Sequence, residues 1–127
     1  MKFVLKNILV IEHEAVVALD IIQNFSKNGY NIVAHALSLT FILRNLKKFE
    51  ETDIILVDAD LSDFIEKLNT MEKVYQSVKK PLIIIASHLD DAIIDRCKNY
   101  ETIKIVEKPI SSDELIEIAG KMLKELN

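Results

Sequence analysis

Short apolar runs alternate with longer segments of helical periodicity along the whole chain, and this alternation limits the possible folds most strongly. The runs are rich in β-branched residues, which is typical of strands that are buried on both faces of a parallel sheet. The expected strands are about 6–12, 30–36, 53–57, 82–86 and 102–106, and the expected helices are about 14–27, 40–49, 63–78, 90–98 and 112–126. Five strand–helix units of similar length predict an α/β fold with a doubly wound parallel sheet.

Local signals support the expected ends of several helices. Asn28-Gly29 ends the first helix, and Lys79-Lys80-Pro81 separates the third helix from the strand that follows it. Ser111 stands three residues before Glu114, which is the spacing of a capping box at the start of the last helix. These signals leave no linker between the units, so we expect one domain, 1–127, without an output domain.

Composition narrows the class of protein. The net charge of −4, with acids and bases interleaved, argues against a nucleic-acid-binding surface. No apolar run approaches the roughly 20 residues that a membrane-spanning helix needs, so we expect no membrane association. A single cysteine, Cys97, excludes an internal disulfide and suits the reducing cytoplasm. We interpret Cys97 itself as a small buried side chain.

Polar residues follow the apolar runs where the expected strands end. Asp58 closes the run 53–57, and Glu12, Ser87 and Lys108 stand at the corresponding ends of three other strands. Open parallel sheets bind ligands in the crevice outside the carboxyl ends of their strands. We therefore expect these four side chains to converge on one edge of the sheet.

The converging side chains suit phosphoryl chemistry. Oxygen ligands for Mg²⁺ could come from Glu12, Glu14, Asp58 and Asp60. Lys108 could pair with Asp58 and later with phosphate oxygens, and the Ser87 hydroxyl could bind one of them. An aspartate beside a metal, a lysine and a hydroxyl is suited to covalent acceptance of a phosphoryl group.

Each of these residues also has an ordinary structural interpretation. Asp58 could be a solvated residue at a strand end, and Lys108 a surface lysine. Ser87 stands three residues before Asp90, which is the spacing of a helix cap. Neither Gly29 nor Gly120 follows a strand, so the glycine-rich loop of nucleotide-binding enzymes is missing, and an ATPase or dinucleotide enzyme is disfavoured.

The chain resembles the receiver domain of bacterial two-component response regulators over essentially its whole length. The segment 8–14 (ILVIEHE) is similar to the first strand and acidic pair of that family, and 53–61 (DIILVDADL) to its phosphorylation strand. The segment 83–87 (IIIAS) resembles the strand that ends in a conserved Ser or Thr. Residues 107–109 (EKP) look like the Lys-Pro pair, which is typically cis, and 28–33 (NGYNIV) like the entry into the second strand.

The resemblance implies a fold and a set of roles. The fold is a flavodoxin-like (βα)5 sheet with strand order 2-1-3-4-5. Asp58 is implied as the phosphoacceptor, with Ser87 and Lys108 contacting the phosphoryl group. Mg²⁺ is implied at Glu12, Asp58 and the backbone carbonyl of Asp60.

The resemblance also implies partners. The phosphoryl donor is a sensor histidine kinase or a histidine phosphotransfer protein, as in two-component phosphorelay signal transduction. Without an output domain, the signal passes to an unknown downstream protein in trans. Phosphorylation is expected to pull Ser87 inward and to shift the face formed by 90–98, 102–106 and 112–126. The same face is a common dimer surface in the family, which leaves a homodimer open.

Several positions depart from the family pattern. His13 stands where the family usually has a second aspartate that binds the metal directly, and imidazole is a poor Mg²⁺ ligand. Glu14 could replace this acid in part, or could simply be an acid at a helix N-terminus. Ser62 and Glu66 replace a usual proline and glycine, and Ile105 replaces the aromatic residue that usually swings between buried and exposed positions.

These departures leave more than one functional hypothesis. The chain could be a receiver that accepts a phosphoryl group on Asp58, or a pseudo-receiver that binds partners without phosphorylation. A small flavodoxin-like enzyme is disfavoured, because phosphate-binding loops are missing, and we expect no enzymatic activity. His88 could face the same pocket as Ser87, whereas His35 lies late in its strand. The three histidines do not have the spacing of a zinc site.

Overall fold

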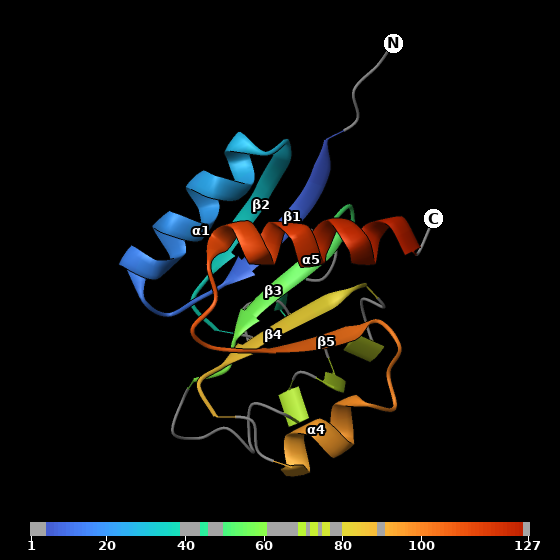
Figure 1. Cartoon of the computed structure of the whole chain (residues 1–127). Helices are drawn as coiled ribbons and strands as arrows, with labels where there is room; N and C mark the ends of the chain where they lie inside the picture. The colour runs from blue at the N-terminus through green and yellow to red at the C-terminus, as the bar shows by residue number, and fades with distance from the viewer. Residues whose placement is uncertain are drawn as a thin grey trace.

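The computed structural model has a central sheet of five strands (Figure 1). It describes residues 5–38, 44–45, 50–60, 69–70, 72–73, 75–76, 80–88 and 91–125. The strands are β1 (Lys6–Ile11), β2 (Tyr30–Ala36), β3 (Ile54–Asp58), β4 (Leu82–Ala86) and β5 (Ile103–Glu107). All neighbouring strands are parallel, and their order is β2-β1-β3-β4-β5, as the resemblance implied.

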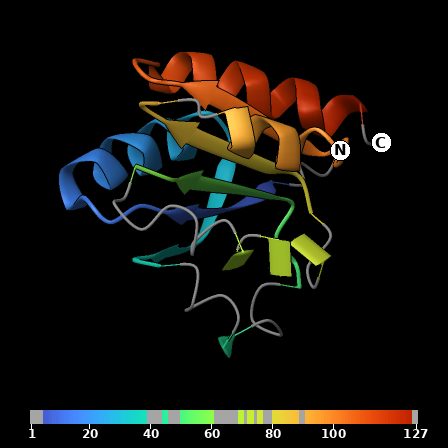
Figure 2. The same ribbon diagram turned by 90° about the horizontal axis from the view of Figure 1, so that it is seen from below.

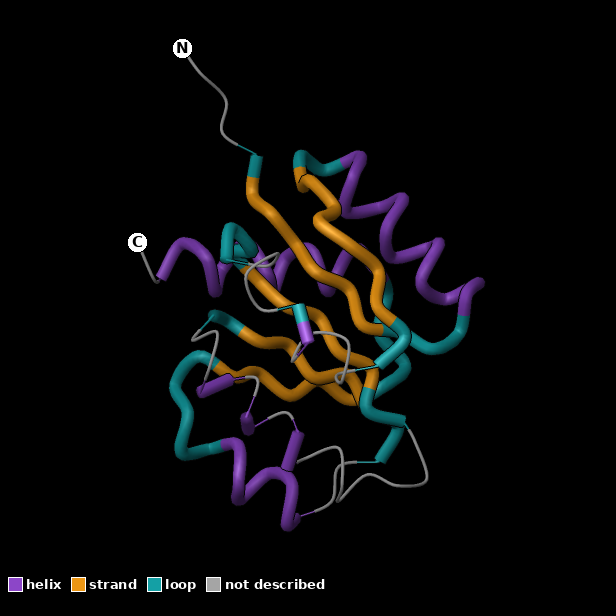
Figure 3. Tube along the Cα trace, turned by 180° about the vertical axis from the view of Figure 1, so that it is seen from behind, coloured by secondary structure: helices purple, strands orange, loops and turns teal. Residues whose placement is uncertain are grey.

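The strands follow the apolar runs because those runs are buried on both sides of the sheet. Every residue of β3 and β4 is buried, including Asp58. Figure 3 shows the five strands from behind, lying side by side with a marked twist. Alternate residues of β1, β3 and β4 belong to different apolar clusters, so the sheet separates two layers of core.

Three helices are described in full: α1 (Ala15–Lys27), α4 (Asp91–Cys97) and α5 (Ser112–Glu125). Figure 2 shows α5 as a layer above the strands. Phe25 of α1 and Leu115 of α5 share one apolar cluster, while Ile93 and Cys97 of α4 belong to the cluster on the opposite face. The expectation that Cys97 is a small buried side chain is confirmed.

The expected boundaries differ from the observed ones by about one residue. β3 and β5 each continue one residue beyond the expected end, because Asp58 pairs with Ile85 and Glu107 pairs with Ala86 in the parallel ladder. The first helix begins at Ala15, because the backbone of Glu14 is extended (φ −95°, ψ 114°). The expected helix 40–49 lies almost wholly outside the described residues. In the expected helix 63–78, residues 69–70, 72–73 and 75–76 are described and are helical.

The predicted helix ends are found where they can be tested. Gly29 follows α1 with a φ of 87°, a left-handed conformation that glycine adopts without strain. The Ser111 hydroxyl accepts a hydrogen bond of 3.1 Å from the amide of Glu114. The Lys108–Pro109 peptide bond is cis. Among the described helices, none is long and apolar enough to cross a lipid bilayer.

Candidate functional site

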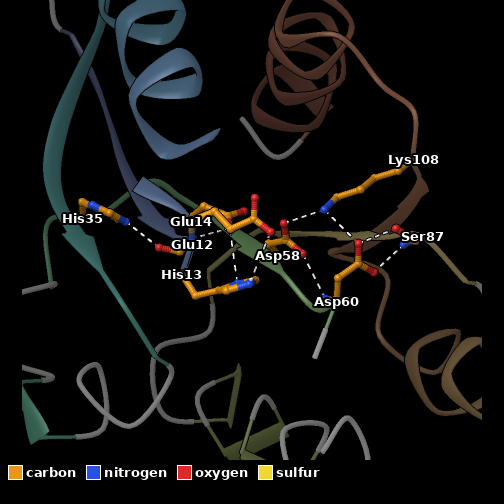
Figure 4. Close-up of polar contacts among 8 residues, drawn as sticks. All are labelled: Glu12, His13, Glu14, His35, Asp58, Asp60, Ser87 and Lys108. Atoms are coloured by element: carbon orange, nitrogen blue, oxygen red, sulfur yellow. Dashed lines mark hydrogen bonds and ion pairs between the residues drawn. The ribbon is translucent and has the colours of Figure 1, made fainter. Parts of the chain in front are cut away.

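The carboxyl ends of four strands bring the expected side chains together (Figure 4). Glu12 directly follows β1, Asp58 is the last residue of β3, and Ser87 and Lys108 directly follow β4 and β5. Because the strands are parallel and adjacent in the order β1-β3-β4-β5, their ends meet at one edge of the sheet. The convergence that the sequence predicts is therefore present.

Asp58 lies at the centre of this cluster. Its Oδ2 accepts a hydrogen bond of 2.7 Å from Nζ of Lys108, and its Oδ1 accepts one of 2.9 Å from the amide of Asp60. The side chain is only 3% exposed. Burial acts to raise the pKa of Asp58, but the Glu12 carboxyl and the Lys108 ammonium lower it overall. Asp58 is thus a buried carboxylate that remains ionised at neutral pH.

Asp60 contributes its side chain to the cluster through contacts with Ser87 and Lys108, which the sequence did not predict. Its Oδ2 lies 2.8 Å from Nζ of Lys108 and 2.5 Å from the hydroxyl of Ser87. Its Oδ1 accepts a hydrogen bond of 2.5 Å from the amide of Ser87. The sequence suggested Asp60 as an oxygen ligand for Mg²⁺, and the resemblance implied its backbone carbonyl in that role. The signal that could have revealed the side chain is its spacing, since an acid two residues beyond Asp58 can reach the end of the adjacent strand.

Lys108 forms ion pairs with two acids. Its ammonium contacts both Asp58 and Asp60. Partial burial acts to lower the pKa of Lys108, but its hydrogen bonds to these carboxylates raise it overall. Lys108 is therefore a permanent cation at this edge of the sheet.

Glu12 is the most deeply buried acid of the cluster. Its side chain is 2% exposed, and its Oε1 accepts a hydrogen bond of 2.9 Å from the amide of Glu14. Its Oε2 is buried and has no hydrogen-bond partner among the described residues. Burial, followed by the neighbouring Asp58 carboxyl, raises the pKa of Glu12 to about 7. Near neutral pH, Glu12 therefore keeps its proton in a substantial fraction of the molecules.

His13 and His35 lie beside Glu12, whereas His88 lies elsewhere. The Nδ1 atom of His13 is 3.4 Å from Oε1 of Glu12, and its Nε2 is 3.6 Å from Oε1 of Glu14. His35 contacts the backbone carbonyl of Glu12 through Nε2 at 2.6 Å. Glu14 itself is 63% exposed. His88 follows Ser87 and is exposed.

A cavity of about 470 Å³ opens beside Asp58. It is lined by polar residues, among them Asp58, Ser87 and Lys108, and by apolar residues such as Ile21 of α1 and Leu115 of α5. Asp58 therefore borders this cavity, although its side chain is only 3% exposed. A reactant in the cavity would lie next to the carboxylate.

The acids offer a limited set of ligands for Mg²⁺. Within the described ranges, no group of three or more His, Cys, Asp or Glu side chains is arranged to hold a metal ion. Mg²⁺, however, is usually held by one or two carboxylates, with waters and phosphate oxygens completing its shell. The unpartnered Oε2 of Glu12, beside the Asp58 carboxylate, fits this requirement. The residues present therefore suit a weakly held Mg²⁺ at Glu12 and Asp58.

Comparison with known proteins establishes the family. Residues 8–120 match the response regulator receiver domain. The chain belongs to this family. Receiver domains are the signal-receiving modules of response regulators, so the chain belongs to two-component signalling. A comparison with curated protein sequences finds no match.

Solved receiver structures share the fold at low sequence identity. A response regulator from Thermotoga maritima superimposes with a TM-score of 0.80 at 17% identity, covering 95% of this chain and 99% of its own. A CheY-like receiver domain protein from Methanospirillum hungatei has a TM-score of 0.80 at 21% identity, covering 96% of each chain. A two-component response regulator from Clostridium difficile has a TM-score of 0.81 at 17% identity, covering 96% and 98%. These likenesses establish the fold.

Proposed function

We propose that this receiver domain accepts a phosphoryl group on Asp58 and passes the signal to another protein in trans. One observation carries the proposal: a buried, ionised carboxylate lies at the end of β3, is held by Lys108 and faces an open cavity. A carboxylate that is hydrogen-bonded to a lysine and also borders a cavity is positioned to act as a nucleophile toward a reactant in that cavity. The proposed donor is the phosphohistidine of a sensor histidine kinase or a histidine phosphotransfer protein.

The reaction we propose is a single displacement at phosphorus. An oxygen of Asp58 attacks the phosphorus atom, a P–O bond forms, and the P–N bond of the phosphohistidine breaks. Its electron pair returns to the imidazole ring, which leaves as neutral imidazole when its other nitrogen carries a proton. Lys108 is within hydrogen-bonding distance of Asp58, so its ammonium can balance the charge that accumulates on the phosphoryl oxygens. When bound, Mg²⁺ would add further charge neutralisation, with Glu12 and Asp58 holding it.

The phosphorylated state would differ mainly in what Ser87 and Lys108 contact. Both residues adjoin strands that lead to α4 and α5, so a change in their contacts can alter that face of the domain. The downstream partner is a protein that recognises this face. The proposal involves no nucleic acid and no enzymatic turnover of a separate substrate.

An intact-mass experiment tests the proposal. The protein is incubated with acetyl phosphate and either Mg²⁺ or Mn²⁺. We expect the mass to increase by one phosphoryl group, and we expect Asp58→Asn to abolish the increase. Acetyl phosphate tests the acceptor without requiring the cognate kinase. The proposal fails if no adduct forms with either metal.

His13 favours a second candidate, a pseudo-receiver that binds partners without phosphorylation. Its ring lies beside Glu12, at the position where the family usually has a metal-binding acid. The variant His13→Asp separates the two candidates. If only His13→Asp forms the adduct, the native chain is a pseudo-receiver whose metal site has been lost. If the wild type forms the adduct at a comparable rate, the second candidate is rejected.

A further inference from the structure

The Asp60 carboxylate already accepts the hydrogen bonds that the proposed phosphoryl group on Asp58 would need. The Ser87 amide, the Ser87 hydroxyl and the Lys108 ammonium all direct their protons at its two carboxylate oxygens, over distances of 2.5 to 2.8 Å. These groups come from the ends of β4 and β5, whereas Asp60 follows β3. The contacts therefore join three separate strand ends through one side chain.

The charge and shape of Asp60 suit this position. A carboxylate presents two oxygens to donors much as a phosphoryl group does, and hydrogen bonds to a charged acceptor are stronger than neutral ones. Partial burial acts to raise the pKa of Asp60, but Lys108 and Ser87 lower it overall, so the group is anionic at neutral pH. The side chain is 24% exposed, which leaves it a path into solvent if a stronger anion arrives.

We propose that the carboxylate of Asp60 is a built-in competitor that holds the anion-binding donors Ser87 and Lys108 in the unphosphorylated state. Phosphorylation of Asp58 adds negative charge next to Asp60 and supplies oxygens for the same donors. Asp60 must then withdraw from them. Asp60 thereby slows the transfer of the phosphoryl group to Asp58. Ser87 and Lys108 change their contacts only when the phosphoryl group has displaced Asp60.

The contacts of Asp60 with these donors do not depend on the proposed function, although their role in signalling rests on it. Two independent measurements separate these ideas. The first uses inorganic phosphate as a probe of the donors alone. It compares Asp58→Asn with the double variant D58N/D60A and follows the amide signal of Ser87 in ¹H–¹⁵N NMR spectra.

We expect the D58N/D60A protein to bind phosphate at least about tenfold more tightly than Asp58→Asn, because the donors are then free. Equal affinity, or a Ser87 signal that does not respond in the double variant, would overturn the proposal. Circular dichroism establishes that both proteins are folded. D58N/D60N serves as a second variant, since asparagine keeps the shape of the side chain but removes its charge, and we expect intermediate affinity.

The second measurement follows acetyl phosphate labelling by intact mass in wild type, Asp60→Asn and Asp60→Ala. We expect labelling of Asp60→Ala to be about tenfold faster than wild type, with Asp60→Asn between them. Asp95→Asn is the matched control. Asp95 lies on α4 and forms an exposed ion pair with Lys98, so the substitution removes an equal charge away from the site. We expect its labelling rate to stay within about twofold of wild type.

The two measurements give distinguishable failures. If wild type is labelled but neither Asp60 variant is faster, Asp60 does not restrain acceptance, and the proposal is overturned while the proposed function stands. If no protein is labelled, the proposed function fails, and the phosphate titration alone decides whether Asp60 competes for the donors.

Discussion

At the scale of single residues, the site holds three acids, two of them ionised and one protonated below neutral pH. Lys108 keeps Asp58 and Asp60 ionised, whereas burial keeps Glu12 protonated until near neutral pH. The same cluster thus contains the proposed nucleophile, an internal anion and an acid that must lose its proton before it can bind a cation. Metal binding at Glu12 is therefore expected to release a proton.

Glu12→Gln should change how stability depends on pH. The pKa of Glu12 is raised by folding from 4.5 to about 7, so its neutral form is the one that favours the native state. The stability it contributes is fully present below pH 4.5 and is lost as pH rises through about 7. Glutamine remains neutral throughout. The difference in unfolding free energy, variant minus wild type, should therefore rise by roughly 1–3 kcal/mol between pH 5 and pH 8.5.

Urea unfolding of both proteins in metal-free buffer, at four pH values across this range, measures that difference. Taking the difference between the two proteins removes the contributions of ionisable groups that do not contact residue 12. A difference that stays constant with pH would show that Glu12 is already ionised at pH 5.

At the scale of secondary-structure elements, local pattern predicted most of what is observed. Apolar runs located all five strands to within about one residue, because burial on both faces requires uninterrupted apolar sequence. The exact ends were less predictable, since the inclusion of Asp58 in β3 depends on pairing with Ile85 of a different strand. The proximity of Asp58, Ser87 and Lys108 was also predictable, because each stands at the end of an apolar run and parallel strands end at the same edge of the sheet.

Two features of the site could not be read from local pattern. The direction of the Asp60 side chain is set by donors on Ser87 and Lys108, which are distant in sequence. The burial of Glu12 and its unpartnered oxygen depend on the neighbouring strands and on the helix that covers them. Both features arise from tertiary contacts, which no periodicity of the sequence encodes.

The N-terminus of α5 offers a test at the same scale. Ser111 accepts a hydrogen bond from the amide of Glu114, which would otherwise lack a partner in the first turn. Ser111→Ala should lower the free energy of unfolding by about 1 kcal/mol. Ser112→Ala is the comparison, because the Ser112 hydroxyl bonds to Asp20 between exposed groups that water can satisfy instead. Urea denaturation measures both, and an equal loss in the two variants would contradict the capping role.

At the scale of the whole molecule, the sheet joins two apolar layers into one unit. Ile83 of β4 packs with α1 and α5, whereas its neighbour Ile84 packs with α4 on the other face, and both are 0% exposed. A strand that is buried on both sides cannot lose one layer without exposing its own apolar side chains to water. The site at the strand ends therefore rests on a scaffold that we expect to unfold as a whole.

Conservative substitutions on the two faces of β4 test this cooperativity. Ile83→Val and Ile84→Val each remove one buried methylene, and each should lower the free energy of unfolding by about 0.5–1.5 kcal/mol. If the layers form one cooperative unit, both variants should shift the urea midpoint and leave the slope of the transition unchanged. Ile94→Val, on α4 at 37% exposure, is the control and should cost less than either. A second unfolding phase in only one variant would show that the layer on that face unfolds separately.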